Sequence, residues 1–171
     1  MYIMNFTKQN YNDKQIDIYE TYNVILTSTK PFGTPTGNND VDYAIDWSFL
    51  PDQPYNVHFT YLGGLNNLDG SKVANIFVNL GCVNHTYHAS DVVASPLSSY
   101  LGVLKPYVLG TTSFLLSEDN TNPPIYIGSR PRNNIFNISI RDLSDALFTP
   151  TTGSLSSYRL NLRFVPVKNN L

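Results

Sequence analysis

The sequence predicts an all-β protein, a two-sheet antiparallel β-sandwich of the single jelly-roll type with about eight strands. Short segments repeatedly alternate apolar and polar residues with a period of two, which is typical of half-buried strands. Clusters of Pro, Gly and Asn separate these segments, and no segment has the pattern of a long helix. Evenly spaced short strands with turn residues between them indicate a sandwich or barrel, and eight strands joined by Greek-key connections form a jelly roll.

Composition indicates one domain with contact-prone surfaces. The chain has 171 residues, which corresponds to about one domain. Charged residues make up 14% of the chain and Tyr occurs 12 times. Soluble domains carry about 25% charged residues, and protein interfaces favour Tyr over Lys and Glu. The net charge of −2 gives no support for a nucleic-acid partner.

The N-terminal part divides into an arm and the start of the domain. Residues 1–14 open with a short apolar piece and then become polar, so we expect an arm or an edge strand there. Residues 15–171 are expected to form the single jelly-roll domain. Within them, residues 15–29 predict a long strand, and residues 30–40 predict a loop because they contain two prolines and two glycines.

The segment from residue 43 to residue 62 is predicted to be a hairpin that seeds the core. Alternate residues of its second arm, from Tyr55 to Tyr61, are apolar and share one face. Pro51 and Pro54 supply the turn between the arms, because proline fixes its own φ and has no N–H. Trp47, the only tryptophan, lies in this segment and brings a large apolar area.

The rest of the chain predicts further short strands. Pro106 interrupts the strand over residues 100–109, which indicates a sheet edge or a bulge there. Residues 142–148 are predicted to form one or two helical turns. The other expected strands cover residues 72–82, 113–117, 125–128, 135–141 and 158–167. The predicted core contains Trp47, Tyr55, Val57, Phe59, Ile76, Val78, Phe136, Ile138, Leu160 and Leu162.

Several segments resemble a viral protein family. The run Asp46–Pro51 followed by Tyr55–Tyr61 is similar to a recurring hairpin in small jelly-roll capsid proteins of double-stranded DNA viruses. These are the minor capsid, penton and cement proteins of large DNA viruses, polinton-like viruses and virophages. The segments Asn122–Ile127, Arg130–Phe136 and Tyr158–Phe164 are similar in the same way. The resemblance covers roughly residues 40–167, consists of strand and turn patterns, and implies a structural, oligomeric virion protein.

Two groups of residues contain possible metal ligands. Cys82, His85 and His88 contain ligand types that zinc uses, but a structural zinc site needs four ligands and a second pair is missing. The acids Asp40, Asp42 and Asp46 lack the glycine and terminal glutamate of a calcium loop, and the strand pattern places them outward in solvent. We therefore expect no metal and no cofactor.

No catalytic arrangement stands out in the sequence. A Gly-x-Ser-x-Gly elbow, which marks many serine hydrolases, is missing. Carboxylate pairs for glycoside hydrolysis need a pocket, which the sequence does not define. We therefore expect a protein that is not an enzyme and that has no catalytic residues.

Interface candidates come from turns and from the arm. Arg130 and Arg132 flank Pro131 and fit either solvated loop charges or bidentate pairing with carboxylates of a neighbouring subunit. Arg159, Asn161 and Arg163 form an outward polar stripe, which fits either solvent exposure or an interface. The predicted interface residues are Arg130, Arg132, Asn133, Asn134, Tyr2, Phe6 and Phe32.

These observations lead to one functional prediction and one alternative. We predict a viral structural protein, a minor capsid, penton or cement component that forms a trimer or pentamer and contacts other capsid proteins. No nucleic-acid partner and no direct membrane insertion are expected. The lone Cys82 and the missing secretory signal favour synthesis in a reducing compartment of the host, with the virion as the destination. The alternative is a lectin-like carbohydrate-binding β-sandwich in which exposed aromatic rings stack on sugars.

Overall fold

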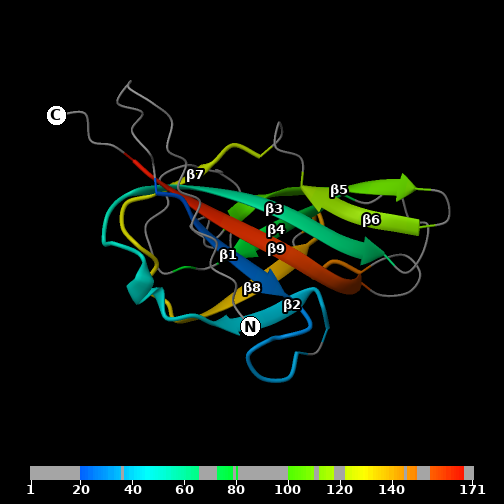
Figure 1. The fold of residues 1–171 in the computed structure, drawn as a ribbon. Coiled ribbons are helices and arrows are strands. Elements are labelled where there is room, and N and C mark those ends of the chain that lie inside the picture. The colour runs from blue at the N-terminus through cyan, green and yellow to red at the C-terminus, as the bar shows by residue number, and fades with distance from the viewer. Residues whose placement is uncertain are drawn as a thin grey trace.

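A computed structural model describes residues 20–35, 37–65, 73–78, 80, 100–109, 112–117, 122–144, 146–149 and 155–167. The described residues form nine strands and one short 3₁₀ helix, so the all-β prediction is confirmed (Figure 1). The strands are β1 (Tyr22–Thr27), β2 (Asp40–Ala44), β3 (Tyr55–Leu65), β4 (Ala74–Val78), β5 (Tyr100–Leu109), β6 (Thr112–Ser117), β7 (Ile125–Ile127), β8 (Ile135–Arg141) and β9 (Leu155–Pro166), and the helix η1 spans Trp47–Phe49.

The strands form a single, strongly curled antiparallel sheet. Its order is β1-β9-β3-β6-β5-β4-β8-β2, and β7 pairs with β3 beside this path. The hydrogen-bonded path is therefore continuous, where the sequence predicted two separate sheets. We call β1, β9, β3 and β6 the β9 half, and β5, β4, β8 and β2 the β8 half. The hairpin of β5 and β6 joins the two halves.

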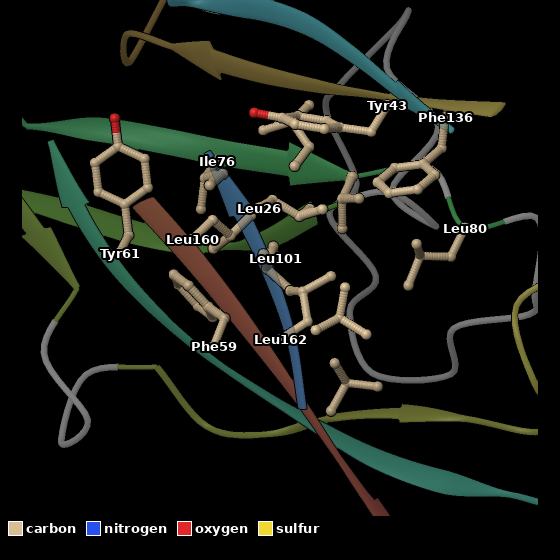
Figure 2. Packing of buried hydrophobic residues seen from close by; sticks show 14 of the residues in the cluster. Leu26, Tyr43, Phe59, Tyr61, Ile76, Leu80, Leu101, Phe136, Leu160 and Leu162 are labelled. Carbon is tan, nitrogen blue, oxygen red and sulfur yellow. The ribbon is translucent and has the colours of Figure 1, made fainter. Parts of the chain in front are cut away.

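The core lies where the curled sheet folds back on itself. The ring of Trp47 packs against Phe136 of the β8 half and Phe164 of the β9 half, with both centroid distances 5.6 Å. The hydroxyl of Tyr43 on β2 donates to that of Tyr158 on β9 at 3.1 Å. Figure 2 shows side chains from both halves in this cluster. All ten predicted core residues are buried, from Trp47 through Phe136 to Leu162.

The predicted hairpin over residues 43–62 is wrong. Strand β2 pairs with β8, and β3 pairs with β9, so the two arms belong to opposite halves of the sheet. Residues 45–54 cross between the halves instead, and η1 lies within this crossing. Asp46 caps η1 by accepting a hydrogen bond from the Ser48 N–H at 3.0 Å. Period-two alternation defines which face of a strand is buried, but it does not define the neighbouring strand.

The sequence predicted an edge or a bulge at Pro106, and among the described residues Pro106 has a paired strand on one side only. The pairing of β4 with β5 ends at Leu104, while the pairing of β5 with β6 continues through Pro106 to Leu109. Beyond Leu104 one side of β5 is therefore not covered by β4. A proline fits there because it has no N–H to donate to a strand on that side.

The predicted helical turn over residues 142–148 is wrong. The Asp142 carboxylate accepts hydrogen bonds from the Ser144 N–H at 2.9 Å and the Ala146 N–H at 3.1 Å. Arg141 and Leu147 then form an antiparallel bridge. The aspartate side chain thus stabilises a tight turn in place of a helix, as Asp does readily. Among the described residues, no helix has the length and apolar character needed to span a membrane.

Candidate functional site

Two segments that cross between the halves of the sheet are hydrogen-bonded to each other at one end of the molecule. We call residues 45–54 and 128–134 the corner, because both segments pass between the halves of the sheet. The Ile45 N–H donates to the Asn134 carbonyl at 2.7 Å, and Trp47 Nε1 donates to the Asn133 carbonyl at 2.9 Å. Arg130 Nη1 donates to the Leu50 carbonyl at 3.3 Å. The turn predicted as an interface therefore also has an intramolecular structural role.

The predicted interface residues lie in different environments. Arg130 is half-buried at the corner, whereas Arg132 and Asn134 are exposed. Phe32 is 52% exposed, and its N–H donates to the Asp42 carbonyl of β2 at 2.7 Å. Contacts between these residues and another subunit stay a prediction. Asn133 is half-buried, and Tyr2 and Phe6 lie outside the described residues.

The three acids that resemble a loose calcium cluster in the sequence do not share one site in the structure. Asp40 and Asp42 lie side by side on β2, and the Asn137 amide donates to them at 2.7 and 2.9 Å. Asp46 instead caps η1, and hydrogen bonds from Ser48 hold the pKa of its carboxyl below the usual value. Cys82, His85 and His88 lie outside the described part of the chain. Among the residues described, no three His, Cys, Asp or Glu side chains are grouped to hold a metal ion.

A strip of apolar side chains runs over the outer face of β3, β6 and β5. The register aligns Leu62 with Leu116 and Lys105, and Gly64 with Phe114 and Tyr107, so Lys105 borders the apolar side chains on this face. Residues paired in an antiparallel sheet point to the same face, so these side chains lie together. Leu62 and Tyr107 are each 51% exposed, and Leu109 is 63% exposed. We call Leu62, Tyr107, Leu109, Phe114 and Leu116 the apolar strip.

The hairpin that carries the strip is also apolar on its other face. Val108 points to the opposite side from Leu109 and is still 46% exposed. Its partner across the hairpin, Ser113, is 1% exposed, so only the β5 side of the tip extends past the core. The sequence indicated a strand here but not this exposure, because the register between β3, β6 and β5 determines which side chains gather.

A polar notch opens in the sheet beside the strip. One edge of β3 pairs with β7 through Val57 and with β6 from Leu62 onward. Between these two strands the Ser117 hydroxyl accepts the Tyr61 N–H at 2.7 Å. A cavity of about 330 Å³ lies at this interruption. We call it the notch, and it is lined by His58, Phe59, Thr60, Asn122, Pro124, Asn161 and Arg163.

Asn122 shapes one wall of the notch by taking the place of a paired strand. Its amide accepts from the Val103 N–H at 2.7 Å and donates to the Val103 carbonyl at 2.9 Å. The neighbouring Gly102 allows this close approach, because a Cβ there would lie 2.6 Å from the Phe59 ring and would also meet the Asn122 oxygen. The wall is thus fixed from both β5 and β3.

The opposite wall consists of the outward stripe on β9. His58 pairs with Arg163 across β3 and β9, and Thr60 pairs with Asn161. The Asn161 Oδ1 atom is buried and has no hydrogen-bond partner in the structure as described. The sequence predicted this outward stripe, but the interruption between β6 and β7 that makes it a notch was not predictable from local pattern.

Comparisons with known proteins leave the family open. No family model, no curated protein and no solved structure matches the chain. The structure itself shows an all-antiparallel β protein with one curled sheet. The resemblance to jelly-roll capsid proteins therefore remains an expectation from strand and turn patterns.

Proposed function

We propose that this chain is a structural protein of a virion, a minor capsid, penton or cement component that assembles with itself and with other capsid proteins. On this proposal the chain contacts other copies of itself and other capsid proteins, and it catalyses no reaction. Assembly as a trimer or pentamer uses exposed surfaces of the sheet. The virion is its destination, after synthesis in a reducing compartment of the host.

The nested pairing of the strands supports a jelly roll. When β7 is left aside, the first strand pairs with the last, the second with the second-last, and so on inward. These pairs are β1 with β9, β2 with β8, β3 with β6, and β4 with β5. In a jelly roll, a long two-stranded ribbon with this nested pairing is wrapped around a core. Its successive strand pairs then lie alternately in two facing layers.

The apolar strip is the observation that carries the assembly proposal. Single exposed apolar residues are common on monomeric proteins, but adjacent ones on a continuous surface mark contact sites. In the strip, Leu62 on β3 and Tyr107 and Leu109 on β5 are each more than half exposed on the same face of the sheet, on either side of β6. A second copy of the chain that covers this face removes apolar area from water, which favours association.

The test is the mass of the full-length protein in solution. Sedimentation velocity or light scattering coupled to size exclusion should show a closed oligomer for the parent protein. The triple variant Leu62→Ser, Tyr107→Ser, Leu109→Ser should lose assembly and retain the β-rich circular-dichroism spectrum. The matched control is Ile135→Ser with Leu143→Ser, because these residues are 57% and 77% exposed away from the strip. The control variant should assemble like the parent.

Two outcomes contradict the assembly proposal. One is a parent protein that stays monomeric at high concentration and binds no other virion component. The other is an oligomer that the triple variant and the control variant affect equally. A chain without residues 1–14 tests the arm separately, and we expect it to keep the fold and lose assembly. That result adds an exchanged arm to the contacts made by the strip.

A further inference from the structure

The notch has the size and the mixed lining of a small-ligand site. Ligand sites are concave, start at roughly 300 Å³, and combine apolar surface with a few convergent polar groups. The notch measures about 330 Å³ and is lined by both kinds of residue. Phe59 and Pro124 supply the apolar part, and the residues around them are polar. Assembly through the apolar strip gives no role to these polar groups.

The basic side of the notch favours an anionic group. Arg163 lies opposite His58 in the β3–β9 register, and both residues line the cavity. Among the described residues that line the notch there is no Asp or Glu. A guanidinium binds a carboxylate through two parallel hydrogen bonds, which fixes both position and orientation. A carboxylate on the ligand fits this side of the notch.

The adjacent amide favours a hydroxyl group on the same ligand. A buried acceptor without a partner is unfavourable, so a donor group on a ligand that reaches it makes binding more favourable. Asn161 Oδ1 is such an acceptor, and it lies two residues before Arg163 on the same strand face. Thr60, paired with Asn161, adds a hydroxyl that both donates and accepts.

We infer that the notch is a binding site for an acidic sugar, a single ring that bears hydroxyl groups and one carboxylate. Arg163 holds the carboxylate, and Asn161 with Thr60 holds hydroxyl groups. Pro124 and Phe59 contact the C–H surface of the ring. Asn122 keeps the wall in place through its paired hydrogen bonds with Val103. The site needs no exposed aromatic platform, and Trp47 is buried at 1% exposure.

The experiment compares three probes on the full-length protein by ligand-observed NMR titration. D-glucuronate carries the ring and the carboxylate, D-glucose lacks the carboxylate, and acetate lacks the ring. We expect glucuronate to bind at least tenfold more tightly than either of the other two. Equal binding of acetate would leave only an anion site and overturn the sugar assignment. Equal binding of glucose would overturn the role of the carboxylate, and no binding of glucuronate would overturn the site.

Matched variants on one strand locate the site. Arg163→Gln should weaken glucuronate binding about tenfold or more, because it removes the charged fork. Arg159→Gln is the control, since Arg159 is also exposed on the outer face of β9 but does not line the notch. Asn161→Asp should weaken binding similarly by placing a carboxylate against that of the ligand. An equal loss in the Arg163→Gln and Arg159→Gln variants would mean general charge attraction and would overturn the assigned site.

Discussion

At the corner, backbone and side-chain hydrogen bonds connect residues 45–54 to residues 128–134. At the opposite end of β3, the β5–β6 hairpin leaves Tyr107, Val108 and Leu109 about half exposed or more. Both regions join the two halves of the sheet. The corner uses its aromatic and polar groups within the chain, whereas the hairpin leaves apolar groups available. Stability should therefore depend on the corner, and association on the hairpin.

Removing the corner's central ring is expected to have the largest effect on stability. Trp47 is 1% exposed and contacts Phe49, Phe136 and Phe164. Trp47→Ala leaves a cavity between both halves of the sheet and removes the hydrogen bond to Asn133. We expect the free energy of unfolding to fall by about 3–5 kcal/mol, measured by denaturant titration. A loss under about 1 kcal/mol would mean that the corner does not hold the halves together.

The buried tyrosine pair is expected to have a smaller effect. In Tyr158→Phe, the Tyr43 hydroxyl loses the partner that lies 3.1 Å away in a buried site. We expect a loss of about 1–3 kcal/mol in the free energy of unfolding. The double variant with Tyr43→Phe removes both hydroxyl groups and should recover part of that loss. A double variant that is no more stable than Tyr158→Phe alone would contradict this account.

Tyr61 offers a matched control for the same kind of substitution. Its ring packs against Tyr158 with a centroid distance of 5.1 Å, but its buried hydroxyl has no hydrogen-bond partner in the described structure. Tyr61→Phe removes an unsatisfied polar group and keeps the ring, so stability should stay unchanged or rise. A loss comparable to that of Tyr158→Phe would show that the Tyr61 hydroxyl has a partner in solution.

Alkaline pH should weaken the corner side of the sheet. Burial, assisted by a hydrogen bond to the Glu20 carboxylate, raises the pKa of Tyr22 from its ordinary value near 10 to about 12. Because the folded pKa is the higher one, the stability that Tyr22 contributes is complete below pH 10 and is lost as the pH rises through about 12. The tyrosine's ring contacts Tyr55, whose pKa burial also raises.

The measurement is the melting temperature between pH 9 and pH 12 for the parent and for Tyr22→Phe. The variant should lose less stability over this range, because it has no phenol there to ionise. Part of the loss should remain, since burial also raises the pKa values of Tyr61 and Tyr158. Identical pH profiles for both proteins would contradict the assignment to Tyr22.

The sequence predicted which side chains near the corner are buried, but not which strands pair there. Alternation correctly placed Tyr55, Val57 and Phe59 on the buried face of β3. It could not reveal that β2 pairs with β8, because that partner is distant in sequence and the crossing at Trp47 decides it. Strand pattern describes one segment at a time, whereas a sheet is built from pairings between segments.

The candidate sites were less predictable for the same reason. Arg163 and Asn161 were recognisable as an outward stripe, but the notch exists only because β7 and β6 pair with separate parts of β3. The apolar strip likewise gathers Leu62 and Tyr107 from segments far apart in the chain. The sequence analysis did not predict the strip, and the one local signal for it is a strand that is apolar on both faces, as in residues 107–109.

The smallest expected effect is on the folding stability of the hairpin tip. Leu109→Ser replaces a side chain that is 63% exposed, and surface substitutions of this kind usually change stability by at most about 0.5 kcal/mol. Denaturant titration at low protein concentration should therefore give the parent value within that range, while the same variant weakens assembly at high concentration. The pairing of Leu109 with Thr112 closes the hairpin and stays possible with serine. A loss above about 1 kcal/mol under dilute conditions would show that Leu109 packs within its own chain, so that the hairpin resembles the corner and the contrast between the two ends fails.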